Sequence, residues 1–166
     1  SNAKALGIEN MAEACVQGRG VLIDLEKRHG RKRVLVGYEE LMKILKEDNI
    51  KIEEGDMACF HTGFAQGLID MNKNPNEHDL HHTFACLDGR DEKLHNWIRD
   101  IGISVIIADN YGIEDVGTPL PKGTDPIAML PLHELCIFKL GIHIGEMFYL
   151  TPLRNWLRDN NRNRFL

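Results

Sequence analysis

Three short apolar runs, each followed by a polar turn, constrain the fold of this chain more than any other feature. They lie in GRGVLIDL at 18–25, EEGDMACFHT at 53–62 and ISVIIAD at 103–109. In the second stretch a polar turn, EEGD, comes before the strand. Amphipathic helices are predicted between them, at 38–47 and 91–101, because apolar residues recur there at helical spacing. Buried strands that alternate with such helices predict an α/β domain.

The rest of the chain adds elements of the same kinds. Helices are expected at 6–15, 132–140 and 152–160, an extended segment at 142–148, and a loop rich in Gly, Pro and Thr at 112–126. Residues 64–90 show weak periodicity, so we expect a long excursion there, of the kind that often carries function. No repeat interrupts the pattern, and residues 1–166 are predicted to form one domain.

Composition and charge argue against several kinds of partner. The 166 residues are 43% apolar and 27% charged, which is ordinary for a globular domain with one core. The formal net charge of −5 leaves no broad cationic surface for nucleic acid or membrane, and basic clusters at 27–33 and 154–164 are expected to be solvated. Because no apolar run approaches the about 18 residues that span a bilayer, and no signal pattern opens the chain, a cytoplasmic location is expected.

The sequence also lacks the motifs of several common activities. Its four cysteines are widely spaced without a CxxC pair, and three of them sit in apolar segments, where buried reduced thiols are expected. There is no phosphate loop, no GxGxxG after a strand and no GxSxG elbow. Nucleotide-binding and serine-hydrolase functions are therefore not expected.

The stretch PLHELCIFKLGIHIGEMFYL, residues 131–150, places two histidines and two glutamates in a mostly apolar segment. It is not the HExxH zinc motif, because Ile137 stands where the second histidine would be. His133 and Glu146 could still converge in the fold, as a nitrogen and an oxygen donor suited to Zn²⁺ or Mn²⁺. A hydrogen-bonded core or capping histidine at position 133 is the alternative.

Further polar candidates for a pocket follow the predicted strands. His61 ends one strand, Asp109 and Asn110 end another, and His143 lies in the extended segment. The ends of strands are where α/β folds commonly place ligand-orienting groups. Structural hydrogen bonds and turn formation would explain the same residues equally well.

A third cluster consists of His78, His81 and His82, in NEHDLHHTF. Three imidazoles and two carboxylates in so short a stretch could bind a transition metal. A polar, hydrated loop is the simpler interpretation of the same residues.

Four blocks of the sequence together resemble the cyclase family of metal-dependent hydrolases, which includes bacterial kynurenine formamidase and isatin hydrolase. The blocks are GRGVLIDL, EEGDMACFHTGF, ISVIIADNYGIE and PLHELCIFKLGIHIGEMFYLTPL, in the order and spacing of the family. The resemblance implies a swivelling β/β/α fold, with a mixed sheet flanked by helices. It also implies a divalent metal ion, Zn²⁺ or Mn²⁺, with His133 and Glu146 as ligands.

The resemblance covers the central and C-terminal part of the family pattern. Relatives carry an HxGTHxDxxxH segment upstream of the GRGVLIDL block, which supplies the other metal ligands and the catalytic histidine, and they continue into a further strand after WLRDNNRNRFL. Neither occurs in residues 1–166, so the fold is expected to be truncated and the catalytic histidine to lie upstream of residue 1. No catalytic residue is predicted within the chain.

For the parent protein the resemblance implies hydrolysis of C–N bonds in small amides or cyclic imides, often aryl, as in the arylformamidase reaction of tryptophan catabolism. With most ligands missing, this chain is expected to bind metal weakly or not at all, and to be inactive. The alternative is a non-catalytic fragment of the fold that self-associates, because missing strands would expose sheet edges and apolar surface. A homo-oligomer, either a dimer or a tetramer, is expected.

Overall fold

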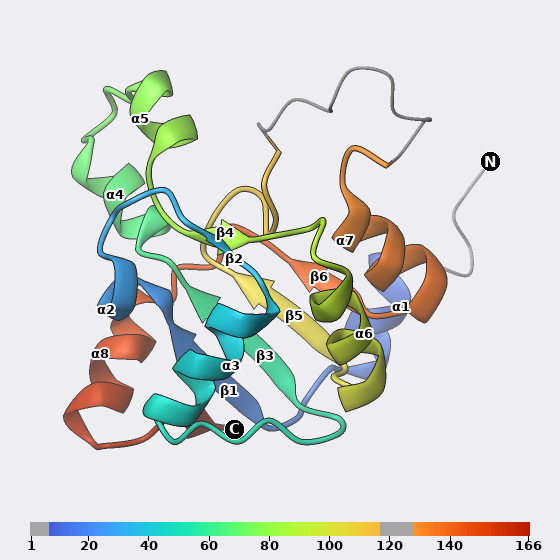
Figure 1. Cartoon of the computed structure of the whole chain (residues 1–166). Coiled ribbons are helices and arrows are strands. Elements are labelled where there is room, and N and C mark those ends of the chain that lie inside the picture. The colour runs from blue at the N-terminus through green and yellow to red at the C-terminus, as the bar shows by residue number, and fades with distance from the viewer. Residues whose placement is uncertain (1–6, 117–127) are drawn as a thin grey trace.

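The computed structural model describes residues 7–116 and 128–166, and its centre is a five-stranded sheet (Figure 1). The strand order is β6-β5-β3-β1-β7. The strands are β1 (Gly20–Asp24), β3 (Met57–His61), β5 (Val105–Ala108), β6 (His143–Gly145) and β7 (Arg164–Phe165). The first four pair in parallel, and β7 pairs antiparallel with β1, so the predicted α/β domain with a mixed sheet is confirmed.

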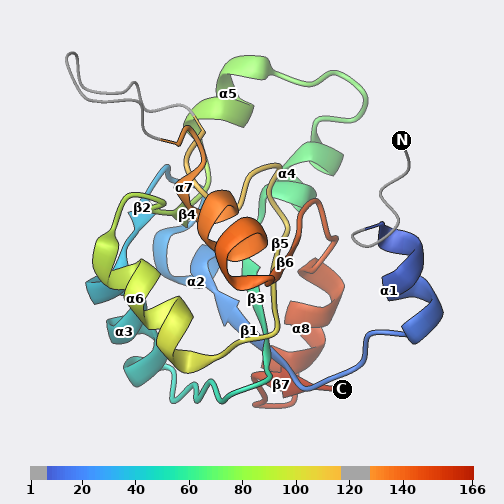
Figure 2. The ribbon, with the colours of Figure 1, turned by 90° about the vertical axis from the view of Figure 1, so that its right-hand side faces the viewer.

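Helices cover both faces of this sheet (Figure 2). Two of them, α3 (Tyr38–Glu47) and α6 (Glu92–Ile101), lie side by side on one face, while α8 (Thr151–Asp159) lies on the other. All three agree closely with the helices predicted from apolar periodicity. α6 begins where Asp91 accepts hydrogen bonds from two backbone N–H groups, and it ends at Gly102, whose φ of 70° suits glycine.

Alternation along β1 explains why the sheet is buried on both faces. Ile23 belongs to the core cluster that includes Leu41 of α3 and Leu94 of α6. Leu22 points to the opposite face, because successive strand side chains alternate, and it lines the same surface hollow as Leu157 of α8. A strand buried on both faces reads as a continuous apolar run, as GVLIDL does.

The prediction of one long excursion at 64–90 is wrong. This segment contains α4 (Phe64–Asp70), α5 (Glu77–His82) and the short strand β4 (Cys86–Leu87), which pairs in parallel with β2 (Leu35–Val36). The helices are too short for an apolar periodicity to show in the sequence, and they depend on contacts such as the edge-on packing of Phe64 and Phe84, whose ring centroids lie 5.4 Å apart.

Three other predicted segments differ in detail. The helix expected at 132–140 is a short turn, α7 (Pro131–His133), that continues as a π-helix, η1 (Glu134–Leu140). The extended segment expected at 142–148 is regular only in β6. Most of the loop expected at 112–126 lies outside the described residues. The helix expected at 6–15 is present as α1 (Ile8–Ala14), and a further short helix, α2 (Leu25–His29), follows β1.

The start of β3 is held by a buried carboxylate. Arg19 donates two hydrogen bonds of 2.7 Å to Asp56, one to each oxygen, and the side chain of Asp56 is 4% exposed. The Arg19 hydrogen bond, together with the Glu53 N–H and the charge of Arg19, holds the pKa of Asp56 below its usual value, although burial opposes them. The carboxylate form is therefore favoured more strongly in the folded protein than in the unfolded chain.

We expect this pair to make the domain sensitive to acid. A lowered folded pKa gives a stabilisation that is complete above the unfolded pKa of about 3.9 and is lost as the pH falls through the folded value. Asp56→Asn should therefore lower stability at pH 7 and flatten the dependence of stability on pH below about 4. Urea unfolding at pH 7, 4 and 3 measures this, and an equally steep loss of stability in wild type and variant would contradict it.

In the described part of the chain, no helix is both long enough and apolar enough to cross a membrane.

Candidate functional site

The parallel strands β1, β3 and β5 end side by side; β1 and β3 end at polar residues, and a polar residue directly follows β5. His61, at the end of β3, is fully buried, and its Nδ1 lies 3.0 Å from a carboxylate oxygen of Asp24, at the end of β1. Because a carboxylate only accepts, Nδ1 carries the proton, and Nε2 is free to accept from the Thr151 hydroxyl at 3.2 Å. Burial alone would raise the pKa of Asp24, but the hydrogen bonds from His61 and the Lys27 N–H hold it below its usual value.

Asp109, which follows β5, belongs to the same buried cluster. Its side chain is fully buried, and it accepts three hydrogen bonds, from the Thr62 N–H at 2.6 Å, the Thr62 hydroxyl at 2.7 Å and the Gly63 N–H at 2.9 Å. Its second oxygen lies 3.9 Å from His61 Nε2. The structure therefore brings the predicted residues His61 and Asp109 together, and gives Asp109 the role of fixing the turn after β3.

The next residue, Asn110, is 4% exposed and has one unusual atom. Its Nδ2 donates to the backbone carbonyl of Ala85 at 3.3 Å, and the backbone carbonyl of Asn110 accepts from the Met147 N–H at 3.0 Å. Its side-chain oxygen is buried and has no hydrogen-bond partner among the described residues. Asn110 thus joins the end of β5 to the segment that follows β6.

The two predicted metal ligands converge. Nε2 of His133, at the end of α7, lies 3.4 Å from Oε1 of Glu146, just after β6, and both side chains are about one quarter exposed. The same oxygen of Glu146 accepts from the Ile113 N–H at 2.8 Å. An imidazole and a carboxylate from different elements therefore face each other, which the spacing of the sequence alone left open.

A third residue, Glu114, which the sequence did not reveal, orients this pair. Its fully buried carboxylate accepts from Nδ1 of His133 at 2.8 Å and from the backbone N–H groups of Leu132 and His133, each at 2.9 Å. It thus satisfies free N–H groups at the start of α7, where a negative charge is favoured. A side chain at Gly89 would overlap this carboxylate and displace it from its partners.

With a proton on Nδ1, Nε2 of His133 presents its lone pair toward Glu146, which is the arrangement of a metal-binding imidazole supported by a carboxylate. Two ligand atoms at about 2.0–2.2 Å from one tetrahedral ion lie about 3.3–3.6 Å apart, so the 3.4 Å between Nε2 and Oε1 fits a shared ion. Within residues 7–116 and 128–166, no group of three or more His, Cys, Asp or Glu is placed to hold a metal ion. The pair is thus suited to supply two ligands of such a site.

The remaining predicted residues make no hydrogen bond or ion pair with either cluster in the described part of the chain. His143 is exposed on the edge strand β6, paired with the first residue of β5, whereas Asp109 follows the last. His78, His81 and His82 lie exposed on α5 rather than in the predicted loop.

The three cysteines in apolar segments behave as predicted. Cys59, Cys86 and Cys136 are free and buried, and burial raises the pKa of each thiol to about 12. Their thiolates are therefore scarce near neutral pH, and they are poor nucleophiles or metal ligands.

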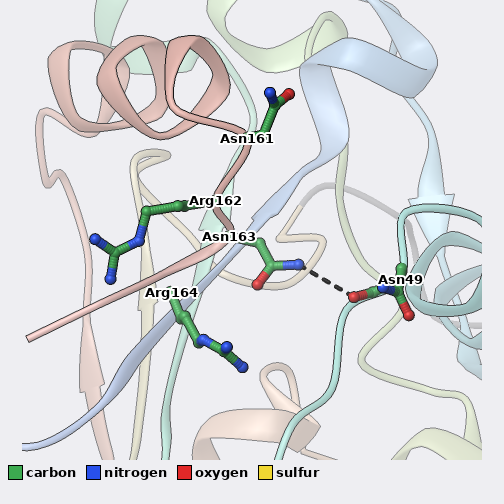
Figure 3. A pocket seen from close by; sticks show the side chains of 5 residues that line it. All are labelled: Asn49, Asn161, Arg162, Asn163 and Arg164. Atoms are coloured by element: carbon green, nitrogen blue, oxygen red, sulfur yellow. Dashed lines mark hydrogen bonds between the residues drawn. The ribbon is translucent and has the colours of Figure 1, made fainter.

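The basic segment at the end of α8 lines two hollows. One, of about 390 Å³, is lined by Asn49 and residues 161–164, and in it Asn163 donates to the Asn49 carbonyl at 3.2 Å (Figure 3). A neighbouring hollow of about 480 Å³ reaches Asp24 and Arg154, and so touches the edge of the His61 cluster. Neither is lined by His133 or Glu146.

A sequence profile of the family described as "Putative cyclase" matches residues 2–115. The chain therefore belongs to the cyclase family, as its sequence blocks indicated. The matched region includes Glu114 and ends before His133 and Glu146, whose roles it does not address.

Solved structures show the same fold. A crystal structure of a novel cyclase matches with a TM-score of 0.77 and 23% identity, over 99% of this chain and 50% of that one. Isatin hydrolase A from Ralstonia solanacearum matches with a TM-score of 0.52 and 14% identity, over 78% of this chain and 46% of its own. The chain spans about half the length of these proteins. No curated protein matches it.

Proposed function

We propose that this chain supplies His133 and Glu146 as two ligands of a divalent metal ion in a hydrolase that cleaves C–N bonds of small amides or cyclic imides. The observation that carries the proposal is the 3.4 Å approach of His133 Nε2 to Glu146 Oε1, with the histidine held from behind by buried Glu114. Membership of the cyclase family and the fold shared with isatin hydrolase support the reaction class.

Each residue has a separate task in this proposal. When bound, Zn²⁺ or Mn²⁺ would lower the pKa of a water molecule and polarise the scissile carbonyl. His133 binds through Nε2, and Glu114 keeps the proton of that imidazole on Nδ1. Glu146 binds through its carboxylate, which the Ile113 N–H holds in place. The half-exposed aromatic side chains of Phe148 and Tyr149, close to Glu146 in the chain, offer apolar surface for an aryl substrate.

Two ligands hold a metal ion only weakly, because a zinc site normally has three or four protein ligands. We therefore expect the 166-residue chain to bind Zn²⁺ weakly at this pair and to hydrolyse substrate slowly or not at all. In this proposal the further ligands and the catalytic histidine come from residues upstream of residue 1 in the longer protein.

The test uses both this chain and the protein expressed from its complete reading frame. We expect the complete protein to retain about one Zn²⁺ or Mn²⁺ per active site by elemental analysis, and to hydrolyse N-formylkynurenine or isatin. His133→Ala and Glu146→Gln should abolish both properties, whereas His143→Ala, which removes an exposed histidine nearby, should change neither. A complete protein with neither metal nor turnover would refute the proposal.

A second candidate function is self-association of the chain. Ile137 and Phe138 on η1 are 53% and 82% exposed, and Met147, Phe148 and Tyr149 are each about half exposed. Apolar surface of this kind often marks a contact with another protein. Light scattering should then show a dimer or larger species that Phe138→Ser weakens, and a monomer at high concentration would refute this function.

A further inference from the structure

We propose that His78 and His82 form a second binding site for a transition-metal ion, on the surface of α5 and independent of His133 and Glu146. The two residues are four apart in a helix, so their side chains lie on one face, one turn above the other. Their rings stack with centroids 4.3 Å apart and an interplanar angle of 15°. Figure 1 places α5 at one end of the molecule, well apart from α7 and β6.

The hydrogen bonds of the pair indicate which ring nitrogen atoms can bind a metal ion. His82 Nδ1 lies 2.8 Å from the His78 carbonyl, which can only accept, so this nitrogen carries the proton and Nε2 keeps the lone pair. Metal-binding histidines usually hold their second nitrogen by such an acceptor. His78 Nδ1 lies 3.6 Å from a carboxylate oxygen of Asp79, which is beyond hydrogen-bond distance, so both nitrogen atoms of that ring are open to a ligand.

The two remaining nitrogen atoms are accessible. Neither Nε2 has a hydrogen-bond partner within the described ranges, and the His78 side chain is 77% exposed. Because exposed imidazoles rotate at little cost, a small movement from the stacked arrangement brings both Nε2 atoms onto one ion. Water molecules are available for the other coordination positions.

His81, on the same helix, has a different task. Its Nδ1 lies 2.8 Å from the Tyr111 hydroxyl, with the two rings edge to face, and Tyr111 in turn packs on Phe64. His81 therefore docks α5 against the segment after β5. It is a useful control, because replacing it removes a histidine from the helix and leaves the stacked pair intact.

The donor atoms define the class of ion. Imidazole nitrogen suits Cu²⁺, Ni²⁺ and Zn²⁺, with Cu²⁺ bound most tightly, whereas Mg²⁺ and Ca²⁺ require oxygen ligands. A bound ion would join two turns of a six-residue helix that is too short to be stable alone. We therefore expect a bound ion to stabilise the helical conformation of α5.

The experiment is a titration of the 166-residue chain, in a His133→Ala background that removes the other proposed site, with Cu²⁺, Zn²⁺ and Mg²⁺ in turn. Calorimetry should show one Cu²⁺ and one Zn²⁺ bound per chain, and no binding of Mg²⁺. In NMR spectra the imidazole signals of His78 and His82 should shift together, and the amides of α5 should exchange more slowly with solvent.

Single variants decide between the pair and adventitious binding. His78→Gln and His82→Gln should each weaken Cu²⁺ and Zn²⁺ binding at least about tenfold, because one of two protein ligands is lost. His81→Gln should leave the affinity within about twofold, since Nδ1 of His81 already serves Tyr111. Equal losses in all three variants, or binding that none of them changes, would overturn the proposal whatever the outcome for His133.

Discussion

Replacement of Asp109 by alanine should lower the free energy of unfolding by about 3–5 kcal/mol, because it leaves buried donors without acceptors. The side chain is fully buried, and it accepts from two N–H groups and one hydroxyl of Thr62 and Gly63. An unsatisfied buried donor costs about 1–3 kcal/mol, and three donors lose their partner at once. Chemical unfolding followed by circular dichroism at pH 7 measures the loss.

Two further variants make the result specific. Asp109→Asn keeps the shape but exchanges one acceptor for a donor, so its loss should lie between those of wild type and alanine. Asp100→Ala removes an exposed carboxylate that pairs with its neighbour Arg99, and it should stay within about 0.5 kcal/mol of wild type. A loss below about 1 kcal/mol for Asp109→Ala would show that water replaces the carboxylate.

Glu114→Gln should have the second largest effect, on both stability and metal binding. The amide cannot accept from all three N–H groups that now converge on the carboxylate, so we expect a loss of about 2–3 kcal/mol in unfolding free energy. Its NH₂ group can also face His133 Nδ1 and reverse the tautomer. The affinity of the proposed site for Zn²⁺ should then fall about 10–100-fold.

The matched control for Glu114→Gln is Glu134→Gln. This glutamate follows His133 directly, and it pairs at the surface with Lys139 at 2.7 Å, so its replacement should change neither stability nor Zn²⁺ affinity appreciably. Glu114→Gln could lower stability without any change in Zn²⁺ binding. That result would support the role of Glu114 in capping the N–H groups at the start of α7 and would refute its role at the metal. Unchanged stability would contradict the capping role itself.

Local patterns in the sequence were sufficient for the central layers of the fold. The strand cores of GVLIDL and ISVIIAD, VLI and VIIA, are buried or nearly so on both faces and therefore read as unbroken apolar runs. The helices α3 and α6 bury one face each, so their charged and apolar residues alternate with helical period. Burial of a strand or of one helix face fixes the pattern of apolar residues among near neighbours in the sequence, which is why these elements could be predicted.

The elements that were missed are those stabilised from outside their own sequence. α4 and α5 are too short to show a period, and they are held by contacts such as Phe64 with Phe84 and His81 with Tyr111. Glu114 lies in a segment predicted as loop, and nothing in GIEDVG distinguishes it from a solvated residue. Its partners, Leu132 and His133, come 18 and 19 residues later in the chain.

The order of buried strands and amphipathic helices, and the residue types that could bind a metal, follow from the sequence, because burial and periodicity act between near neighbours. The meeting of His133 with Glu146, and the placement of Glu114 behind them, follow only from the tertiary structure. Those contacts join the segment after β5, the short helix α7 and the residue that follows β6. Only the parallel pairing of β5 with β6 and the packing of η1 on that sheet bring the three together.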